Sequence, residues 1–168
     1  FFNPVNRMPL VEVIRGAASS GRAIATVFAL ARKLEKTPVI VSDGAGFLVD
    51  RILAPYLNEA GWLLADGLRI EEIDKALLDF GMPMGPIRLL DEVGLDVSRH
   101  AGAVMFEAFG ERMRPAPPLT APLNPRRLGK KSGLGFYKYE EGKHKEVDTT
   151  VYVELGLAAP SRTLPADQ

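Results

Sequence analysis

The sequence contains no cysteine among its 168 residues. This absence excludes a disulfide framework, a thiol nucleophile and a thiolate metal site, and it is compatible with the reducing cytoplasm, where we expect the protein to function. Neither sign of charge is in excess, because 21 basic residues balance 21 acidic ones. A neutral chain gives no general reason to expect binding to nucleic acid or to an anionic membrane surface. No apolar run approaches the roughly 20 residues that span a bilayer, so we expect no membrane span.

The composition is that of a globular protein, with 46% hydrophobic and 25% charged residues. Residues 1–43 are predicted to form a strand, a second strand, a helix and a third strand. Phe1–Val5 and Leu10–Ile14 are short runs rich in strand-forming residues, and apolar residues recur at helical spacing over Ile24–Leu34. Val39–Val41 then predicts the last strand. Strands that alternate with a helix indicate α/β architecture.

From Gly44 onward the spacing of apolar residues is helical. It predicts one helix over residues 47–64, a second that ends before Gly81, a third that begins near Pro86 and a fourth capped by Asp96. We therefore place a domain boundary near Asp43. A proline-rich loop follows, and then the basic, glycine-rich stretch RRLGKKSGLGFYKY, which ends in an aromatic, strand-like piece.

Three segments follow from this pattern. They are residues 1–43, which are α/β, residues 44–139, which are mainly helical, and residues 140–168, whose polar and patternless sequence we interpret as a linker that includes the last eight residues. The basic residues Arg126, Arg127 and Lys130 are interpreted as a solvated surface turn.

Glu12 is the only charged residue within the apolar run LVEVI. A buried carboxylate needs a partner, so two interpretations stay open: a solvent-facing position on an edge strand, or a carboxylate that orients a histidine base. His100 and His144 are the only histidines, and neither is an evident partner. The sequence contains no GxGxxG fingerprint before a helix and no P-loop, and we expect no metal site.

Four collinear segments resemble the 3-hydroxyacyl-CoA dehydrogenase family over residues 1 to about 139. They are FFNPV with MPLVEVI at the start, DGAGFLVDR, GMPMGPIRLLDEVGLD and GKKSGLGFYKY. The resemblance implies a mainly α fold. Its main part would be the helical C-terminal substrate and dimerisation domain of such an enzyme. The last strand–strand–helix–strand piece of a Rossmann α/β domain would precede it.

The resemblance also implies roles for individual residues. In this family the catalytic histidine immediately precedes the first phenylalanine, so we expect the chain to begin one residue after it. Glu12 matches the glutamate of the His–Glu dyad, and Asn3 and Lys131 match residues that contact NAD. Asp50 stands where the family usually has an asparagine that contacts the acyl-CoA substrate. An ionised carboxylate cannot donate the hydrogen bond of that amide, and Asp50 is alternatively a helix-start residue beside Arg51.

The activity implied is that of an NAD-dependent (3S)-3-hydroxyacyl-CoA dehydrogenase of fatty-acid β-oxidation, a part of lipid metabolism that converts 3-hydroxyacyl-CoA to 3-ketoacyl-CoA. As a fragment without the histidine and without most of the NAD site, the chain alone is expected to be inactive. The sequence after FYKY resembles the connection to a second helical repeat in multifunctional fatty-acid oxidation proteins. That resemblance implies an enoyl-CoA hydratase domain in the same polypeptide, a thiolase subunit as partner, and a homo-oligomer.

Two alternatives stay open. One is a non-catalytic helical dimerisation or packing module. The other is a related hydroxyacid dehydrogenase that does not use CoA substrates.

Overall fold

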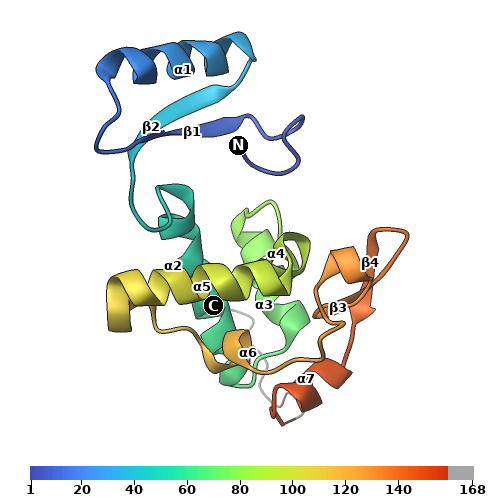
Figure 1. The fold of residues 1–168 in the computed structure, drawn as a ribbon. Helices are drawn as coiled ribbons and strands as arrows, with labels where there is room; N and C mark the ends of the chain where they lie inside the picture. Colours follow the sequence, from blue (N-terminus) through green and yellow to red (C-terminus); the bar gives the residue numbers. More distant parts are fainter. Residues whose placement is uncertain (159–168) are drawn as a thin grey trace. The chain divides into compact units, whose positions relative to one another are not determined.

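The computed structural model describes residues 1–158 and contains two compact units (Figure 1). The first unit comprises Phe1–Ile52, and the second begins at Leu53. Strand–helix–strand structure characterises the first unit and helices dominate the second. This broad description agrees with the sequence-based prediction of an α/β piece followed by a mainly helical region.

In the first unit, strand β1 (Leu10–Arg15) is connected through helix α1 (Gly21–Lys33) to strand β2 (Thr37–Ser42). The two strands pair in parallel, and α1 lies along one side of them (Figure 1). Four buried side chains form the core of this unit: Val11, Val13, Ile24 and Ala31. Because the side chains of a strand alternate between its two faces, Glu12 points to the face opposite Val11 and Val13.

The segment before β1 is a turn and not the strand expected over Phe1–Val5. The backbone N–H groups of Arg7 and Met8 both donate to the carbonyl of Pro4, each at 3.0 Å. Pro4 has no N–H group to donate to a strand partner, and its carbonyl oxygen is taken up by the two amides of the turn. The prediction was therefore wrong for this element and correct for β1, α1 and β2.

Four helices build most of the second unit, and their bounds follow the apolar spacing in the sequence. They are α2 (Val49–Ala65), which begins within the first unit, α3 (Ile70–Phe80), α4 (Pro86–Val93) and α5 (Leu95–Phe109). Gly81 ends α3 in the left-handed conformation, with φ at 112°. None of the helices in the described part of the chain is both long enough and apolar enough to cross a membrane.

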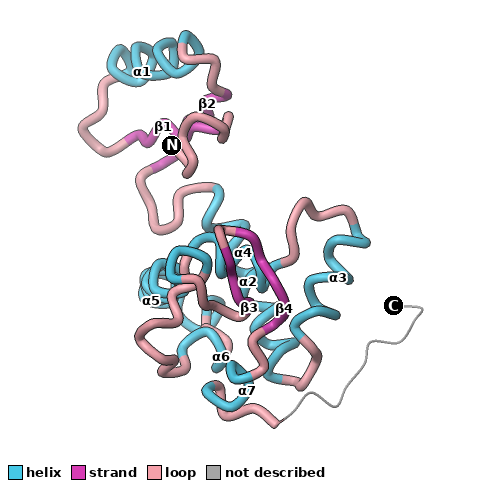
Figure 2. Tube along the Cα trace, turned by 90° about the vertical axis from the view of Figure 1, so that its right-hand side faces the viewer, coloured by secondary structure: helices cyan, strands magenta, loops and turns pink. Residues whose placement is uncertain are grey.

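The remaining elements are short and lie toward the end of the chain. They are α6 (Pro117–Thr120), the antiparallel strands β3 (Tyr137–Glu140) and β4 (Lys143–Val147), and α7 (Thr150–Glu154). Figure 2 shows β3 and β4 side by side.

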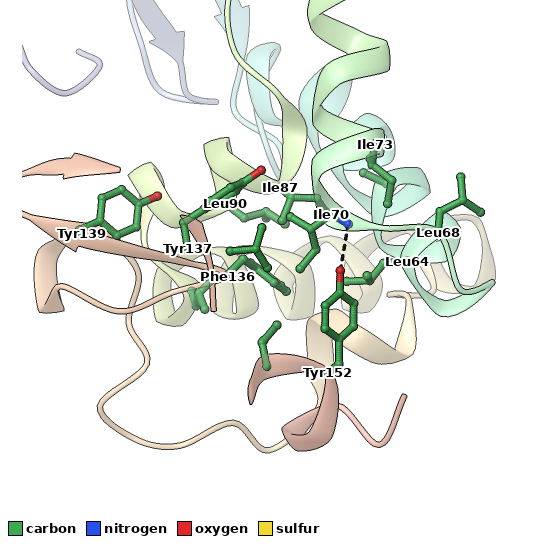
Figure 3. Packing of buried hydrophobic residues seen from close by; sticks show 14 residues of the cluster. Leu64, Leu68, Ile70, Ile73, Ile87, Leu90, Phe136, Tyr137, Tyr139 and Tyr152 are labelled. Atoms are coloured by element: carbon green, nitrogen blue, oxygen red, sulfur yellow. Dashed lines mark hydrogen bonds between the residues drawn. The ribbon is translucent and has the colours of Figure 1, made fainter. Parts of the chain in front are cut away.

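A single hydrophobic core joins these short elements to the helices (Figure 3). Its most deeply buried members come from α2, α3, α4, the residue before β3 and α7: Leu64, Ile70, Ile73, Ile87, Phe136 and Val151. The Tyr152 hydroxyl adds a polar contact, since it accepts a hydrogen bond from the backbone N–H of Ile70 at 3.1 Å.

Part of the segment expected to be a linker is therefore folded. Val147 of β4 and Val151 and Tyr152 of α7 are buried in the core of the second unit. A strand and a helix of five residues each contain too few repeats of their periods for the pattern to be recognised in the sequence. The linker expected over the last eight residues lies outside the described residues.

Candidate functional site

Glu12 lies in the middle of β1, and its side chain is half-buried. Its Oε1 atom accepts hydrogen bonds from the backbone N–H groups of Leu48 at 2.9 Å and Val49 at 3.0 Å. These amides stand at the start of α2, where N–H groups have no partner within the helix and the helix dipole favours negative charge. The Oε2 atom makes no hydrogen bond within the described residues, so it can accept one from another group.

The connection between β2 and α2 returns the chain to the middle of β1. Phe47 donates its N–H to the carbonyl of Gly44 at 2.9 Å and has a left-handed backbone, with φ at 42°. Such a conformation costs a bulky residue on the order of 1 to 2 kcal/mol. The hydrogen bonds to Glu12 offset this cost and attach the connection to the sheet. The two compact units divide after Ile52, within α2.

Asp50 lies in the first turn of α2, immediately after the two amides that bind Glu12. Partial desolvation, and next the negative charge of Glu12, raise the pKa of Asp50 above its ordinary value. A raised pKa favours the carboxylic acid form, which can donate a hydrogen bond. The structure thus brings two predicted site residues, Glu12 and Asp50, to the start of one helix.

Asn3 is exposed and precedes the turn that leads into β1. Its side-chain amide makes no hydrogen bond within the part of the chain that the structure describes. An exposed amide of this kind offers both a donor and an acceptor to a ligand. Asn3 therefore fits a contact to the polar end of a cofactor.

Serine side chains cap the start of α1 and the turn before it. Ser20 Oγ accepts from the N–H of Ala23 in the first turn of the helix, and Ser19 Oγ accepts from the N–H of Gly16 in the preceding turn, each at 3.1 Å. A helix start binds phosphate through free N–H groups. At least one N–H group at this helix start is therefore already bound within the chain, whereas the exposed amide of Asn3 fits a contact to the nicotinamide end of NAD.

Lys131 belongs to the second unit and lies in a 3₁₀ turn, Lys130–Ser132. Its ammonium group pairs with Asp96 Oδ1 at 2.5 Å, and this hydrogen bond lowers the pKa of Asp96. The expected capping role of Asp96 is wrong, because α5 begins at Leu95 and the side chain of Asp96 is turned to Lys131. Both partners of this ion pair are about half exposed, so it contributes little to stability and leaves Lys131 accessible.

Asp74 is a buried carboxylate that the sequence analysis did not identify. Its Oδ1 atom accepts from the N–H of Ile87 at 2.7 Å, and its Oδ2 atom accepts from the N–H of Arg88 at 3.0 Å and from the hydroxyl of Tyr137 at 2.7 Å. Asp74 thus caps the start of α4 from a neighbouring helix. Burial raises its pKa, and these hydrogen bonds oppose the increase.

Asp91 has a similar role where the chain enters β3. Its Oδ1 atom accepts from the N–H of Phe136 and its Oδ2 atom from the N–H of Tyr137, each at 2.9 Å, and Oδ2 also accepts from the hydroxyl of Tyr139 at 3.1 Å. Burial raises the pKa of Asp91 to about 6. A side chain on Gly135 would overlap the carboxylate of Asp91. The close approach of Asp91 to this backbone therefore explains why the basic stretch has a glycine here.

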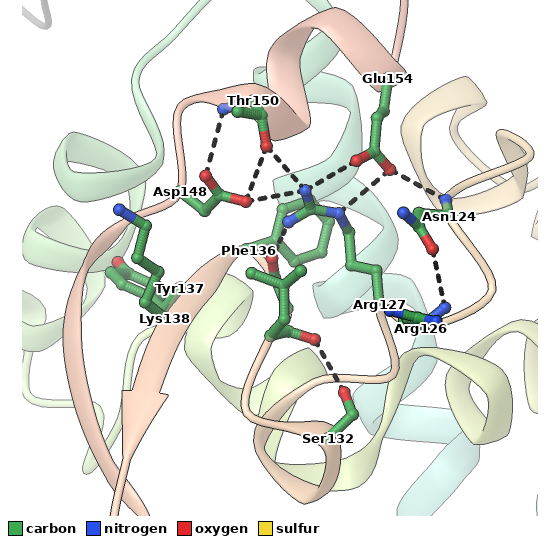
Figure 4. Close-up of polar contacts among 12 residues, drawn as sticks. Asn124, Arg126, Arg127, Ser132, Phe136, Tyr137, Lys138, Asp148, Thr150 and Glu154 are labelled. Atoms are coloured by element: carbon green, nitrogen blue, oxygen red, sulfur yellow. Dashed lines mark hydrogen bonds and ion pairs between the residues drawn. The ribbon is translucent and has the colours of Figure 1, made fainter.

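Arg127 is buried, with its side chain only 1% exposed, so its interpretation as a solvated surface residue is wrong. Its guanidinium group pairs with Asp148 and Glu154, each at 2.8 Å, and also contacts Thr150 Oγ1 and the carbonyl of Gly135 (Figure 4). These partners come from α7 and from the segments around it, which cover Arg127. The arginine therefore connects the end of the described chain to the core.

The two histidines lie in the other compact unit from Glu12. His100 and His144 both belong to the second unit and are exposed, and the ring of His144 packs edge-on against Tyr137 at 5.8 Å. No group of His, Asp and Glu side chains among the described residues could hold a metal ion.

A parallel β–α–β piece with a carboxylate on one face, followed by a helical unit, is an architecture that dehydrogenases with separate cofactor and helical domains use. Residues 1–44 match the NAD binding domain of the 3-hydroxyacyl-CoA dehydrogenases, and residues 46–139 match the C-terminal domain of the same enzymes. The chain belongs to the 3-hydroxyacyl-CoA dehydrogenase family.

Individual relatives agree with this assignment. The fatty acid oxidation complex subunit alpha of Vibrio cholerae is 51% identical over 162 residues, which cover 96% of this chain and 23% of the relative. FadB2 from M. tuberculosis is 41% identical with a TM-score of 0.79 over 83% of this chain and 50% of its own. A (S)-3-hydroxybutyryl-CoA dehydrogenase from Ralstonia eutropha is also 41% identical, with a TM-score of 0.77 over 84% and 51%. The chain thus spans about a quarter of the curated relative.

Proposed function

We propose that the chain is part of an NAD-dependent (3S)-3-hydroxyacyl-CoA dehydrogenase of fatty-acid β-oxidation, which forms 3-ketoacyl-CoA. Family membership supports the reaction class. The observation that carries the proposal is the geometry of Glu12, whose Oε1 atom is bound by two backbone amides while Oε2 remains open. A carboxylate fixed in this way can orient a histidine base and stabilise its imidazolium form.

The other predicted residues have separate roles in this proposal. NAD, when bound, accepts hydride from the substrate. The exposed amide of Asn3 and the accessible ammonium group of Lys131 contact the cofactor, and Asp50 stands next to the reacting end of the acyl-CoA. In its acid form Asp50 donates the hydrogen bond that an asparagine amide would donate.

The domain organisation follows from the same proposal. Residues 1–43 are the closing strand–helix–strand piece of a Rossmann domain, which the parallel pairing of β1 and β2 supports. Residues 44–139 form the helical substrate domain. The burial of Val147 in β4 and Val151 in α7 supports the inclusion of both elements in the helical unit.

We also infer that the parent protein is multifunctional. The Vibrio relative is a subunit of a fatty acid oxidation complex, and its similarity covers 96% of the chain. An enoyl-CoA hydratase domain in the same polypeptide and a thiolase subunit are the partners that this inference implies. Exposed apolar side chains on α5, Val97, Val104 and Phe106, support self-association of the helical unit.

The decisive experiment measures NADH formation by the full-length protein with 3-hydroxyacyl-CoA substrates of several chain lengths. Glu12→Gln is expected to lower kcat at least about a hundredfold, because the amide retains an acceptor for the α2 amides but carries no charge for the histidine. Glu59→Gln, an exposed position on α2, is the matched control and should keep wild-type kinetics.

Two outcomes would contradict the proposal. One is a wild-type protein that oxidises none of the CoA substrates, and the other is full activity of Glu12→Gln. Oxidation of free hydroxyacids alone would identify a dehydrogenase that does not use coenzyme A. Concentration-dependent association without any NADH formation would instead favour a non-catalytic packing module.

A further inference from the structure

Lys36 makes two hydrogen bonds to the turn that precedes β1. Its Nζ atom donates to the carbonyl oxygen of Val5 at 2.5 Å and to that of Met8 at 2.9 Å. The turn is closed by the bonds to the carbonyl of Pro4 described above. One ammonium group thus binds the carbonyl oxygens of Val5 and Met8, which lie near the two ends of the segment between Pro4 and β1.

The end of α1 places Lys36 at this position. The N–H of Glu35 donates to the carbonyl of Arg32 and the N–H of Lys36 to that of Ala31, each at 3.0 Å, while Glu35 has a left-handed backbone with φ at 58°. This pair of bonds is a Schellman motif, which reverses the chain at a helix end. β2 starts at the next residue, so the backbone of Lys36 is fixed on both sides.

Two further observations separate Lys36 from an ordinary surface lysine. Its side chain is partly buried, whereas that of Lys33 in the last turn of α1 is exposed. No acidic side chain pairs with Lys36 within the described residues, so its charge acts on backbone carbonyls alone. Hydrogen bonds from a charged donor are about twice as strong as neutral ones, which suits a clamp on a segment without regular structure.

We propose that Lys36 is a positioning residue that clamps the turn before β1 and thereby fixes the place of Asn3. The turn is short, and Asn3 directly precedes its first residue, Pro4. The side chain of Asn3 makes no hydrogen bond to the described residues, and the turn that follows it is the neighbouring backbone that Lys36 holds. This inference rests on the proposed function, in which Asn3 contacts NAD.

The kinetic test uses three variants of the full-length protein. Lys36→Met removes the ammonium group and keeps a side chain of similar shape. It is expected to raise the KM for NAD about tenfold, the factor that corresponds to losing roughly one charge-assisted hydrogen bond. The KM for the acyl-CoA substrate and kcat should change less than about twofold. Lys36→Arg restores donors and charge and should recover the low KM, and Lys33→Met is the exposed control.

A second measurement does not require turnover. Hydrogen–deuterium exchange of the Arg7 and Met8 amides should become about tenfold faster in Lys36→Met and remain unchanged in Lys33→Met, because the turn opens more often without its clamp. Unchanged exchange in Lys36→Met would overturn the proposal. So would a fall in kcat with both KM values unchanged, since that pattern indicates a loss of folded enzyme.

The two measurements also separate this inference from the proposed function. Wild-type protein without dehydrogenase activity would refute the proposed function, and the exchange rates of Arg7 and Met8 would then decide whether Lys36 clamps the turn. Faster exchange together with wild-type kinetics in Lys36→Met would leave the proposed function intact and refute the positioning role.

Discussion

Replacement of Arg127 by methionine tests whether the end of the described chain is part of the helical unit. Arg127→Met retains the apolar stem and removes the guanidinium group from the carboxylates of Asp148 and Glu154. The loss of one partner from a buried ion pair costs roughly 3 to 5 kcal/mol. The side chain of Glu154 is 26% exposed and can be hydrated, so we expect about 2 to 4 kcal/mol for the network of Arg127.

Urea unfolding monitored by tryptophan fluorescence is a suitable assay, because Trp62 is the only tryptophan and lies in the second unit. Arg126→Met is the matched control, because Arg126 is exposed and its replacement removes the same positive charge.

The hydrogen bond from Arg127 lowers the pKa of Glu154. The associated stability is present above the ordinary pKa of Glu154 and is lost as pH falls through its folded value, so the wild-type protein should be more acid-sensitive than Arg127→Met. Equal unfolding free energies for the two variants would refute the reasoning.

Three other variants test separate features. Asp50→Asn in the full-length protein should raise kcat or lower the KM for acyl-CoA, because an amide always donates a hydrogen bond; equal kinetics would contradict the role of Asp50. Burial raises the pKa of Asp91 from 3.8 to about 6, so its contribution should decrease by about 3 kcal/mol as pH rises through that range. Urea titrations of wild type and Asp91→Asn against pH should show this slope, and parallel curves would exclude it. Gly135→Ala should destabilise the second unit by overlap with Asp91, whereas Gly102→Ala, with open space around it, should not.

The elements that could be predicted from the sequence are those whose apolar residues repeat several times. α2, α3 and α4 each show enough helical turns to reveal a buried face, and Gly81 and Pro86 mark helix ends by their backbone preferences. The predicted strand over Phe1–Val5 was wrong because Pro4 has no N–H group for a strand partner and its carbonyl oxygen accepts two amides of a turn.

Contacts between distant segments could not be predicted in the same way. Asp91 binds amides 45 and 46 residues further along the chain, and Arg127 meets Glu154 at a separation of 27. No local spacing reveals that a polar side chain will be covered by a later element. The basic, glycine-rich composition around Arg127 predicts a solvated turn. In the structure, the segments that include β4 and α7 cover this arginine.

The carboxylates that accept backbone N–H groups can nevertheless be divided by their remaining hydrogen-bonding capacity. Both oxygens of Asp74 and both oxygens of Asp91 have partners within the second unit. Glu12 uses only Oε1, although it binds two amides with it. The second oxygen of the half-buried Glu12 carboxylate has no partner in the described chain and is open to water or to another group. This difference, and not the mere presence of a charge in an apolar strand, supports the proposed role of Glu12 and a structural role for the two aspartates.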